Sequence, residues 1–407
     1  MSKKIVLLVA LLILSAEVTL IEEVKPQPLL VAQLQPPTRT MTPKAAIERL
    51  FTAQTIQSNW FASSFLAQVP ISQVEQIIIS LKTSLGTYQG VQEDGKDYQV
   101  IFERGSVPTQ IVLDAGGQIT GLLFGPPRAK IANLNEATEQ FKALPGKVSL
   151  IVLEGNSERA ALNATTPLAV GSAFKLAVLN ALQIQIAAGK RSWSDVVELQ
   201  SSWKSLPSGI LQTWPDGSRL TIETLAALMI SQSDNTATDS LIHLVGREVI
   251  EAVAPRNRPF LTTRELFILK SSNHEALLKR YQSDDQAQRR AVLNEVDKLP
   301  LPELSDIGST PKALDAEWFF TAQELCGLIE KVADLPLMSI NPGVASAKDW
   351  ERVAFKGGSE PGVLNLTTWL KAKNGKTYCV AATWNNDVPL EEGRFMALYS
   401  GLLESLK

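Results

Sequence analysis

Three short motifs along the chain combine residue types that nucleophilic catalysis needs. They are Ser172-Ala173-Phe174-Lys175, Ser233-Asp234-Asn235 and Lys356-Gly357-Gly358. A serine hydroxyl is a poor nucleophile unless a base lies beside it. Lys175 follows Ser172 by one helical turn, so its amine can reach that hydroxyl. Each motif alone is common, because a capped helix that carries a surface lysine has the same residue spacing. Together the three motifs predict a covalent reaction at Ser172.

The other polar side chains of these motifs suggest supporting roles. Ser233 follows a predicted helix and can pass a proton to a leaving group, and Asn235 offers an amide to a substrate carbonyl. As a second cation, Lys356 would disfavour the protonated form of Lys175 and so keep that amine basic. Ser172, Lys175 and Ser233 are therefore the predicted catalytic residues.

Backbone groups complete the predicted site. The missing side chains at Gly357 and Gly358 would let substrate lie against the edge of a strand. Ser172 is expected at a helix N-terminus, where free N–H groups and the helix dipole favour negative charge on a substrate oxygen. Its N–H and that of Ser359 can form an oxyanion hole. The predicted substrate-binding residues are Asn235, Lys356, Gly358 and Ser359.

The elements that must position these residues form the second of two predicted units. Residues 147–155 are typical of a strand, 171–189 of a buried helix that starts at Ser172, and 220–232 of another helix. Residues 355–387 predict three strands with a hairpin turn at Asn374-Gly375. Helices in the middle with strands at both ends predict an α/β sandwich over 147–407, in which the first strand pairs beside the last ones.

A smaller unit is predicted over residues 43–127, followed by a helical connector over 128–146. Apolar residues at helical spacing predict one or two helices over 43–68 and another over 74–85. Alternating residues such as Val100 and Phe102, with turns between them, predict about four antiparallel strands. This order resembles the ketosteroid-isomerase-like cone, an α+β fold whose bent sheet often leaves a cavity. The alternative is a packed accessory domain without a ligand.

The first residues of the chain predict export. A lysine pair at 3–4 precedes an apolar run to Leu14, and the small residues Ser15-Ala16 follow. Residues 1–24 are therefore predicted to contain a signal peptide removed near Ala16, with a Pro/Gln-rich leader over 25–42. The alternative is an uncleaved anchor. The mature protein is expected in the periplasm or outside the cell, without a stable membrane span.

Composition argues against several other functions. The chain has 39 Lys and Arg against 42 Asp and Glu, a net charge of -3 and no basic stripe, so no nucleic-acid partner is expected. Cys326 and Cys379 lack the spacing of a zinc site and are predicted to be buried free thiols rather than a disulfide. Neither His243 nor His274 stands in a motif for a Ser-His-Asp mechanism. No metal or cofactor is expected.

Residues 147–407 resemble the class A β-lactamase and penicillin-binding superfamily. The resemblance rests on VGSAFKLAVLNAL, on PDGSRLTIETLAALMISQSDNTATDSLI, and on KGGSEPGV followed by a Trp-bearing hairpin. It implies a helical domain beside an antiparallel sheet flanked by helices. It implies that Ser172 is acylated with Lys175 as its base, and that Ser233, Asn235 and Lys356 relay protons, orient substrate and bind an anion. A cone-like unit ahead of such a domain resembles the esterases associated with clavulanic-acid biosynthesis.

Two departures from that superfamily matter. The third motif is KGG and not KTG, so a hydroxyl that binds the substrate carboxylate is missing unless Ser359 replaces it. Class A enzymes hold the deacylating water with a Glu and an Asn four residues later, and no glutamate between Asn235 and Trp318 has such a partner. Glu265 is nearest by position and is predicted to be a surface or structural carboxylate. The long polar segment 255–316 is predicted to form a lid.

The substrate is left open by these patterns. A β-lactamase, an esterase acting on β-lactam-like molecules and a D-alanyl peptidase acting on peptidoglycan stem peptides all attack an acyl group beside a carboxylate, and a fold does not choose among them. The alternative from a different functional class is a penicillin-binding sensor without catalytic activity. Without a visible second base, the acyl-enzyme from a penicillin is predicted to persist, while simple esters turn over faster.

Overall fold

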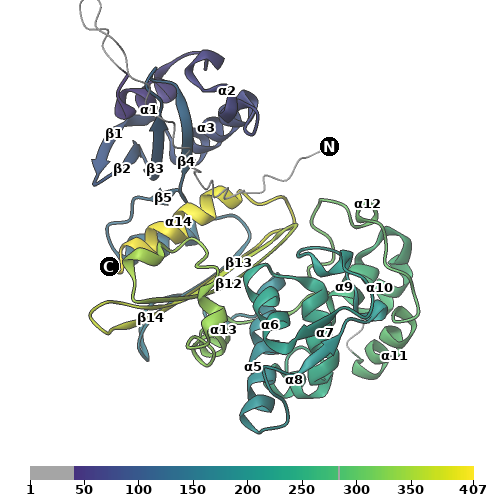
Figure 1. The fold of residues 1–407 in the computed structure, drawn as a ribbon. Coiled ribbons are helices and arrows are strands. Elements are labelled where there is room, and N and C mark those ends of the chain that lie inside the picture. Colours follow the sequence, from purple (N-terminus) through teal and green to yellow (C-terminus); the bar gives the residue numbers. More distant parts are fainter. Residues whose placement is uncertain (1–40, 283–284) are drawn as a thin grey trace, which may run out of the picture. The chain divides into compact units, whose positions relative to one another are not determined.

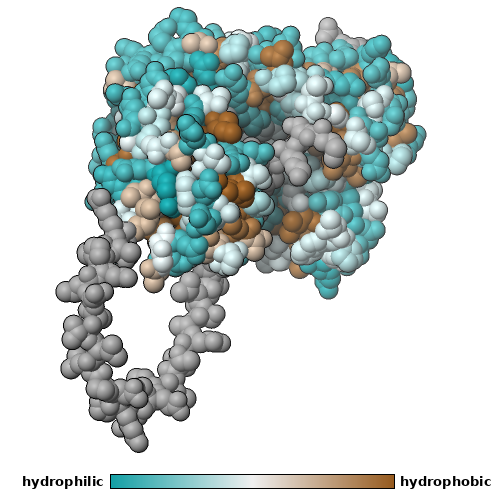
Figure 2. Space-filling model, turned by 90° about the horizontal axis from the view of Figure 1, so that it is seen from above, coloured by the Kyte–Doolittle hydropathy of each residue, from teal (hydrophilic) through white to brown (hydrophobic). Residues whose placement is uncertain are grey.

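The computed structural model describes residues 41–282 and 285–407 (Figure 1). The predicted signal peptide lies outside the described residues, as does the predicted leader up to residue 40. Among the residues that the structure describes, no helix combines the length and apolar character that a membrane crossing needs. On the face shown in Figure 2, the described hydrophobic residues form small separate spots among hydrophilic ones.

The first folded segment places three helices ahead of an antiparallel sheet. Thr42 caps the first helix with its side chain, and Pro43 occupies the first turn, where its missing N–H is not needed. The strands pair in the order β1-β2-β3-β4, with β5 paired to β3. The elements are α1 (Pro43–Thr52), η1 (Ser58–Trp60), α2 (Ser63–Leu66), α3 (Ile71–Leu85), β1 (Tyr88–Asp94), β2 (Asp97–Phe102), β3 (Gly105–Leu113), β4 (Ile119–Phe124) and β5 (Arg128–Ala129). The helices precede the strands, as the sequence predicts. The resemblance of this segment to the ketosteroid-isomerase-like cone stays a prediction.

A second antiparallel sheet joins segments from the two ends of the remaining chain. Its strand order is β12-β13-β14-β6-β7. The first strand of this segment therefore pairs beside the last one, as the sequence predicts, with Ile151 of β6 opposite Ala381 of β14. The predicted turn is also present, since Gly375 has a φ of 86° between β13 and β14. The strands are β6 (Lys147–Glu154), β7 (Ser157–Leu162), β12 (Arg352–Glu360), β13 (Val363–Lys371) and β14 (Thr377–Asn385).

Helices cover both faces of this sheet, because its strands carry apolar side chains on both sides. Ile151 packs into the core shared with the helical region, whereas its neighbours Leu150 and Val152 pack into the core on the opposite face. The helix α13 (Ala322–Glu330) lies on the first side. On the other side lie α4 (Leu134–Lys142) and α14 (Glu392–Glu404). The mixed α/β fold with an antiparallel sheet flanked by helices is thus the predicted one.

The helical region surrounds one central helix, α5 (Lys175–Ala187), shown among its neighbours in Figure 1. Every residue of α5 from Lys175 to Leu182 is buried, so this helix is core on all sides. Its neighbours are α6 (Ile222–Ser231), α7 (Asn235–Val245) and α8 (Arg247–Val253), and α9 (Thr263–Lys270) packs against α7. Two small ribbons, β8 (Leu168–Ala169) with β11 (Phe319–Phe320) and β9 (Val196–Glu198) with β10 (Arg219–Thr221), complete the region. Short 3-10 turns are η2 (Gly171–Phe174), η3 (Ser201–Trp203), η4 (Leu211–Thr213), η6 (Pro336–Ser339) and η7 (Ala347–Asp349).

The polar segment predicted as a lid is mostly helical. After α9 it contains η5 (Ser272–His274), α10 (Glu275–Tyr281), α11 (Gln286–Val296) and α12 (Leu304–Ile307). Leu269 of α9 and Val292 of α11 are completely buried in the same core as α5. Much of this segment is therefore packed against the helical region, because its few apolar residues recur at helical spacing.

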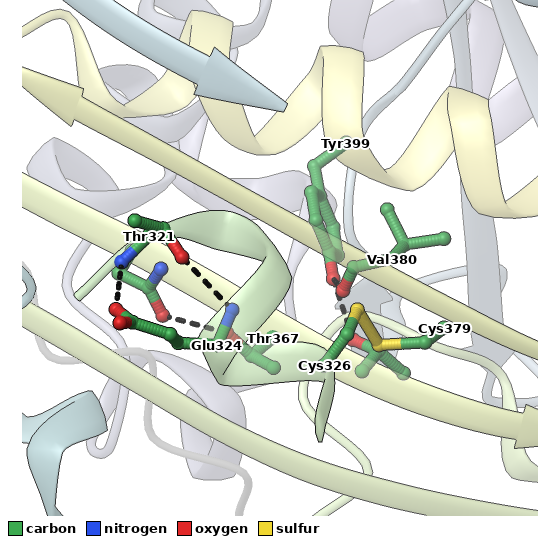
Figure 3. Close-up of a disulfide and its surroundings, with 9 residues drawn as sticks. Thr321, Glu324, Cys326, Thr367, Cys379, Val380 and Tyr399 are labelled. Carbon is green, nitrogen blue, oxygen red and sulfur yellow. Dashed lines mark hydrogen bonds between the residues drawn. A yellow bond between two sulfur atoms is a disulfide. The ribbon is translucent and has the colours of Figure 1, made fainter. Parts of the chain in front are cut away.

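The prediction of two free thiols is wrong. Cys326 of α13 and Cys379 of β14 form a disulfide that ties this helix to the sheet (Figure 3). The two residues are 53 positions apart, and only the packing of α13 on the sheet brings them together. On the opposite face, the hydroxyl of Tyr399 in α14 donates to the carbonyl oxygen of Val380, the next residue of the strand, at 2.8 Å. The strand is therefore attached to a helix on each side.

Candidate active site

Ser172 and Lys175 lie where a short 3-10 turn passes into the central helix. η2 contains Ser172, and α5 begins at Lys175. Gly171 precedes them with a φ of 48°, a conformation that glycine adopts without strain and that turns the chain into η2. Ser172 is partly exposed, whereas Lys175 is completely buried. The predicted nucleophile is therefore accessible, while its predicted base is shielded from water.

Ser233 lies between α6 and α7 in an unusual backbone conformation. Its φ is 54°, which costs a residue with a side chain on the order of 1–3 kcal/mol unless its surroundings hold it there. Asp234 does so: its buried carboxylate accepts from the backbone N–H of Ala237, capping α7, and from that of Ile210 at 2.7 Å. Such maintained strain is typical of functional sites.

Two lysines from different elements meet at the Ser233 hydroxyl. Nζ of Lys175 lies 3.0 Å from Oγ of Ser233 and 2.7 Å from its carbonyl oxygen. Nζ of Lys356, on β12, lies 3.1 Å from the same Oγ. A hydroxyl oxygen can accept two hydrogen bonds, so the proton of Ser233 is left to donate to a third group. The three motifs thus converge at this oxygen, although they are far apart in the sequence.

Asn235 is held in the same network. Its Oδ1 accepts from Nζ of Lys175 at 2.7 Å, and its Nδ2 donates to the carbonyl of Leu206 at 2.9 Å. A side-chain amide has two N–H donors, so one remains for a substrate carbonyl. Asn235 therefore orients Lys175, and its predicted contact with substrate stays a prediction.

Burial makes the two lysines easy to deprotonate. Burial lowers the pKa of Lys175 to about 7, against the opposing charges of Asp239, Asp234 and Glu360. Burial, and then the charge of Lys175, lower the pKa of Lys356 well below its usual range. Two amines that share one hydroxyl lose protons as a coupled pair. At neutral pH the pair therefore includes a neutral amine that can act as a base.

The structure corrects the role expected for Gly358. A Cβ added there would lie 2.1 Å from the carbonyl oxygen of Val170 and 2.5 Å from the backbone nitrogen of Ser172. The space that the missing side chain leaves is filled by the backbone of η2 and not by substrate. Gly358 therefore lets β12 approach η2 closely, and so positions Ser172 relative to Lys356.

The structure also corrects the role expected for the Ser359 hydroxyl. Side chains alternate along a strand, so Lys356 and Ser359 point to opposite faces of the sheet. Oγ of Ser359 lies 3.2 Å from Oε1 of Glu392 on α14, where it cannot replace the hydroxyl of a KTG motif. The backbone nitrogen of Ser359 lies beside Gly171, 3.3 Å from a Cβ added there. That N–H stays a candidate for the oxyanion hole.

Of the two roles predicted for Glu265, a surface or a structural carboxylate, the structure shows the structural one, since this residue is buried. It forms a capping box with Thr262 at the start of α9, and its carboxylate pairs with Arg247 at 2.6 Å. Both of its oxygens accept hydrogen bonds, one from Arg247 and the other from Arg247 and the backbone N–H of Thr262. This carboxylate is therefore committed to holding α9 and is not free to activate water.

A buried acid–base cluster next to these residues was not predicted. Lys270, the last residue of α9, donates to Oε1 of Glu317 and to Oε2 of Glu360. Glu360 follows Lys356 by four positions on β12, so it lies on the same face of the strand. That spacing was visible in the sequence. The association with Lys270 and Glu317 was not, because each comes from a distant segment.

Comparison with known families supports the resemblance drawn from the motifs. Residues 127–289 match the model of the Beta-lactamase enzyme family. The match covers less than half of the chain, includes Ser172, Lys175, Ser233 and Asn235, and ends before Lys356. No curated protein matches the chain. Over those residues the chain is similar to that family.

Several solved structures are similar in fold. A β-lactamase from Sphaerobacter thermophilus is 21% identical, with 67% of this chain and 96% of the other covered and a TM-score of 0.47. The protein PBP-A is 14% identical, with 69% and 98% covered and a TM-score of 0.46. A β-lactamase from Chitinophaga pinensis is 16% identical, with 67% and 98% covered and a TM-score of 0.46.

Metal ligands do not gather in the part of the chain that the structure describes. No group of three or more His, Cys, Asp or Glu side chains there has the arrangement to hold an ion.

Proposed function

We propose that the protein is an active-site-serine acyl hydrolase of β-lactamase type, which acts on β-lactams or related esters and amides through an acyl-enzyme on Ser172. The observation that carries this proposal is the meeting of Lys175 and Lys356 at the Ser233 hydroxyl, beside the helix start that bears Ser172. A buried amine of lowered pKa next to a serine is the activated pair that acyl transfer needs.

Acylation follows from this arrangement. Neutral Lys175 takes the proton of the Ser172 hydroxyl, directly or through a neighbouring hydroxyl, while Oγ attacks the acyl carbon. The negative charge that develops on the acyl oxygen is stabilised by the N–H groups of Ser172 and Ser359. The proton then passes from Lys175 through Ser233, whose Oγ lies 3.0 Å from the lysine Nζ, to the departing nitrogen or oxygen. The products are the ester of Ser172 and a protonated leaving group.

Substrate binding explains why two lysines are present. A substrate carboxylate near Lys356 would favour the charged form of that amine. Because the two amines share the Ser233 hydroxyl, the positive charge on Lys356 would in turn favour neutral Lys175. Binding of an anionic substrate therefore prepares the base. A D-alanyl peptidase has the same requirement and is the second candidate.

Export is part of the proposal. The predicted signal peptide and the disulfide between Cys326 and Cys379 agree with an oxidising compartment, since disulfides are rare in the cytosol. We place the protein in the periplasm or outside the cell. For residues 43–127 we retain the ketosteroid-isomerase-like fold as a proposal, supported by the order of helices and antiparallel strands.

Intact-mass spectrometry with a penicillin tests the nucleophile. The parent protein should gain the mass of the ring-opened drug, and Ser172→Ala should gain none while keeping its thermal midpoint. Ser194→Ala, at an exposed serine, should label as the parent does. An adduct on the Ser172→Ala variant would remove Ser172 as the nucleophile.

A chase with unlabelled drug separates an enzyme from a binding protein. Loss of a fluorescent penicillin label over time indicates a hydrolase, whereas permanent labelling indicates a sensor. A chromogenic cephalosporin, a short acyl ester and a D-alanyl-D-alanine peptide then rank the substrate classes.

A further inference from the structure

We infer that Glu360 is the base that activates the water which hydrolyses the acyl-enzyme. The inference rests on the proposed function. It assigns the deacylating base, for which this sequence lacks the glutamate and asparagine of the class A pattern. Glu265, the carboxylate nearest to the expected position, is fully engaged in the N-terminal cap of α9. Deacylation by a positioned base thus requires a carboxylate from another element.

Strand geometry brings Glu360 to the side of Ser172. A Cβ added at Gly358 would lie 2.5 Å from the backbone nitrogen of Ser172, and Glu360 follows two residues later on the same face of β12. Two residues of a strand span about 7 Å, a gap that a glutamate side chain and one water molecule can bridge. The carboxylate also lies within electrostatic reach of the Lys175 amine, whose pKa it raises. Glu360 therefore approaches Ser172 from the strand, while Lys175 approaches it from the helix.

Exposure distinguishes Glu360 from its partner carboxylate. Side-chain exposure is 18% for Glu360 and 0% for Glu317. Oε2 of Glu317 is buried without a hydrogen-bond partner among the described residues. Lys270 holds both carboxylates, and its ion pair with Oε2 of Glu360 measures 2.9 Å. Glu360 can thus contact a water molecule, whereas Glu317 faces only protein.

Protonation gives the two carboxylates different roles. Burial and the charge of the adjacent Glu360 raise the pKa of Glu317 well above its usual range, which favours the protonated form of Glu317. In that form Glu317 can donate a hydrogen bond to Glu360. Burial acts to raise the pKa of Glu360. The charge of Lys270 and the hydrogen bonds with Glu317 and Lys270 have the larger combined effect and lower this pKa. Glu360 is therefore kept ionised and able to accept a proton.

The proposed step is balanced in atoms and charge. The water oxygen forms a bond to the acyl carbon of the Ser172 ester, and its proton passes to the Glu360 carboxylate. The tetrahedral intermediate then breaks its bond to Oγ of Ser172. That oxygen takes the proton back from Glu360, and the free acid leaves. Glu360 returns to its ionised form, and no other reactant is consumed.

The test is the rate at which the acyl-enzyme disappears, measured by intact mass after rapid mixing with a penicillin. Glu360→Gln keeps the size of the side chain but cannot accept the proton. Deacylation should fall by about 100-fold or more, whereas acylation should change by less than about threefold. The adduct should therefore accumulate. Residual hydrolysis in Glu360→Gln should rise with pH, because hydroxide must replace the lost base.

Matched variants separate a base from a structural residue. Glu265→Gln, at a carboxylate held in the N-terminal cap of α9, should leave deacylation within about threefold of the parent. Glu360→Asp, which withdraws the carboxylate by one methylene, provides the second test if Glu360→Gln unfolds, and it should also trap the adduct.

Parent-like deacylation in Glu360→Gln would overturn the inference and leave the proposed function intact. So would an equal loss of acylation and deacylation, since Glu360 would then position the whole site. Absence of any adduct in the parent would instead overturn the proposed function, and this inference with it.

Discussion

At the scale of single residues, the site depends on where Lys175 is buried. A surface lysine has a pKa near 10.4 and is almost entirely protonated at neutral pH. Burial lowers the pKa of Lys175 to about 7. The neutral, basic fraction therefore rises as the pH increases through 7, and we expect acylation to become about tenfold faster between pH 6 and pH 8. Stopped-flow acylation with a chromogenic cephalosporin measures this profile.

Two variants of Lys356 control for the contribution of charge. Lys356→Arg keeps a cation beside Ser233 and should retain more activity than Lys356→Ala. The loss in Lys356→Ala should be larger for substrates that bear a carboxylate than for uncharged esters. Equal losses on both substrates would mean that Lys356 acts only on the protonation state of Lys175. Separately, a flat pH profile of acylation would show that Lys175 is not the base.

At the scale of elements, the contact between β12 and η2 determines the site. An added methyl at Gly358 would meet the backbone of Val170 and Ser172 at 2.1 Å and 2.5 Å, so one element has to move. We expect Gly358→Ala to slow acylation by about 100-fold, because a shift near 1 Å misaligns the nucleophile. The cost in unfolding free energy should be about 1–3 kcal/mol.

A glycine in α13 provides the control for this substitution. A Cβ added at Gly327 would have no neighbour within 4 Å. Gly327→Ala should therefore leave acylation unchanged and stabilise the helix by roughly 0.5–1 kcal/mol. Gly358→Ala with parent-like acylation would contradict the positioning role of Gly358.

At the scale of the whole molecule, the disulfide links the helical region to the sheet. It closes a loop of 53 residues between α13 and β14. Restricting the unfolded chain over a loop of that length stabilises the fold by about 4 kcal/mol in the chain-entropy treatment. We expect Cys326→Ala combined with Cys379→Ala to lose about this much in urea unfolding. Reduction of the parent should have the same effect, and an unchanged midpoint after reduction would show that the disulfide does not form in solution.

Local patterns in the sequence were enough to predict the main elements and the convergent motifs. Helical spacing predicted the buried helix after Ser172, and alternation with a glycine turn predicted the hairpin at 374–375. These features follow from neighbouring residues, because periodicity and turn chemistry act over a few positions. The motif order likewise predicted that Lys175, Ser233 and Lys356 would meet, and they do.

Only the tertiary structure decided how distant residues share space. The pairing of Cys326 with Cys379 depends on the packing of α13 against the sheet. Gly358 has its role because the backbone of η2 lies against its Cα. The face of the sheet on which the Ser359 side chain lies depends on the register of β12. Glu360 became a candidate base because Lys270 and Glu317, from distant segments, surround it. Each of these contacts joins segments far apart in the chain, and burial and charge there depend on packing that no short stretch of sequence contains.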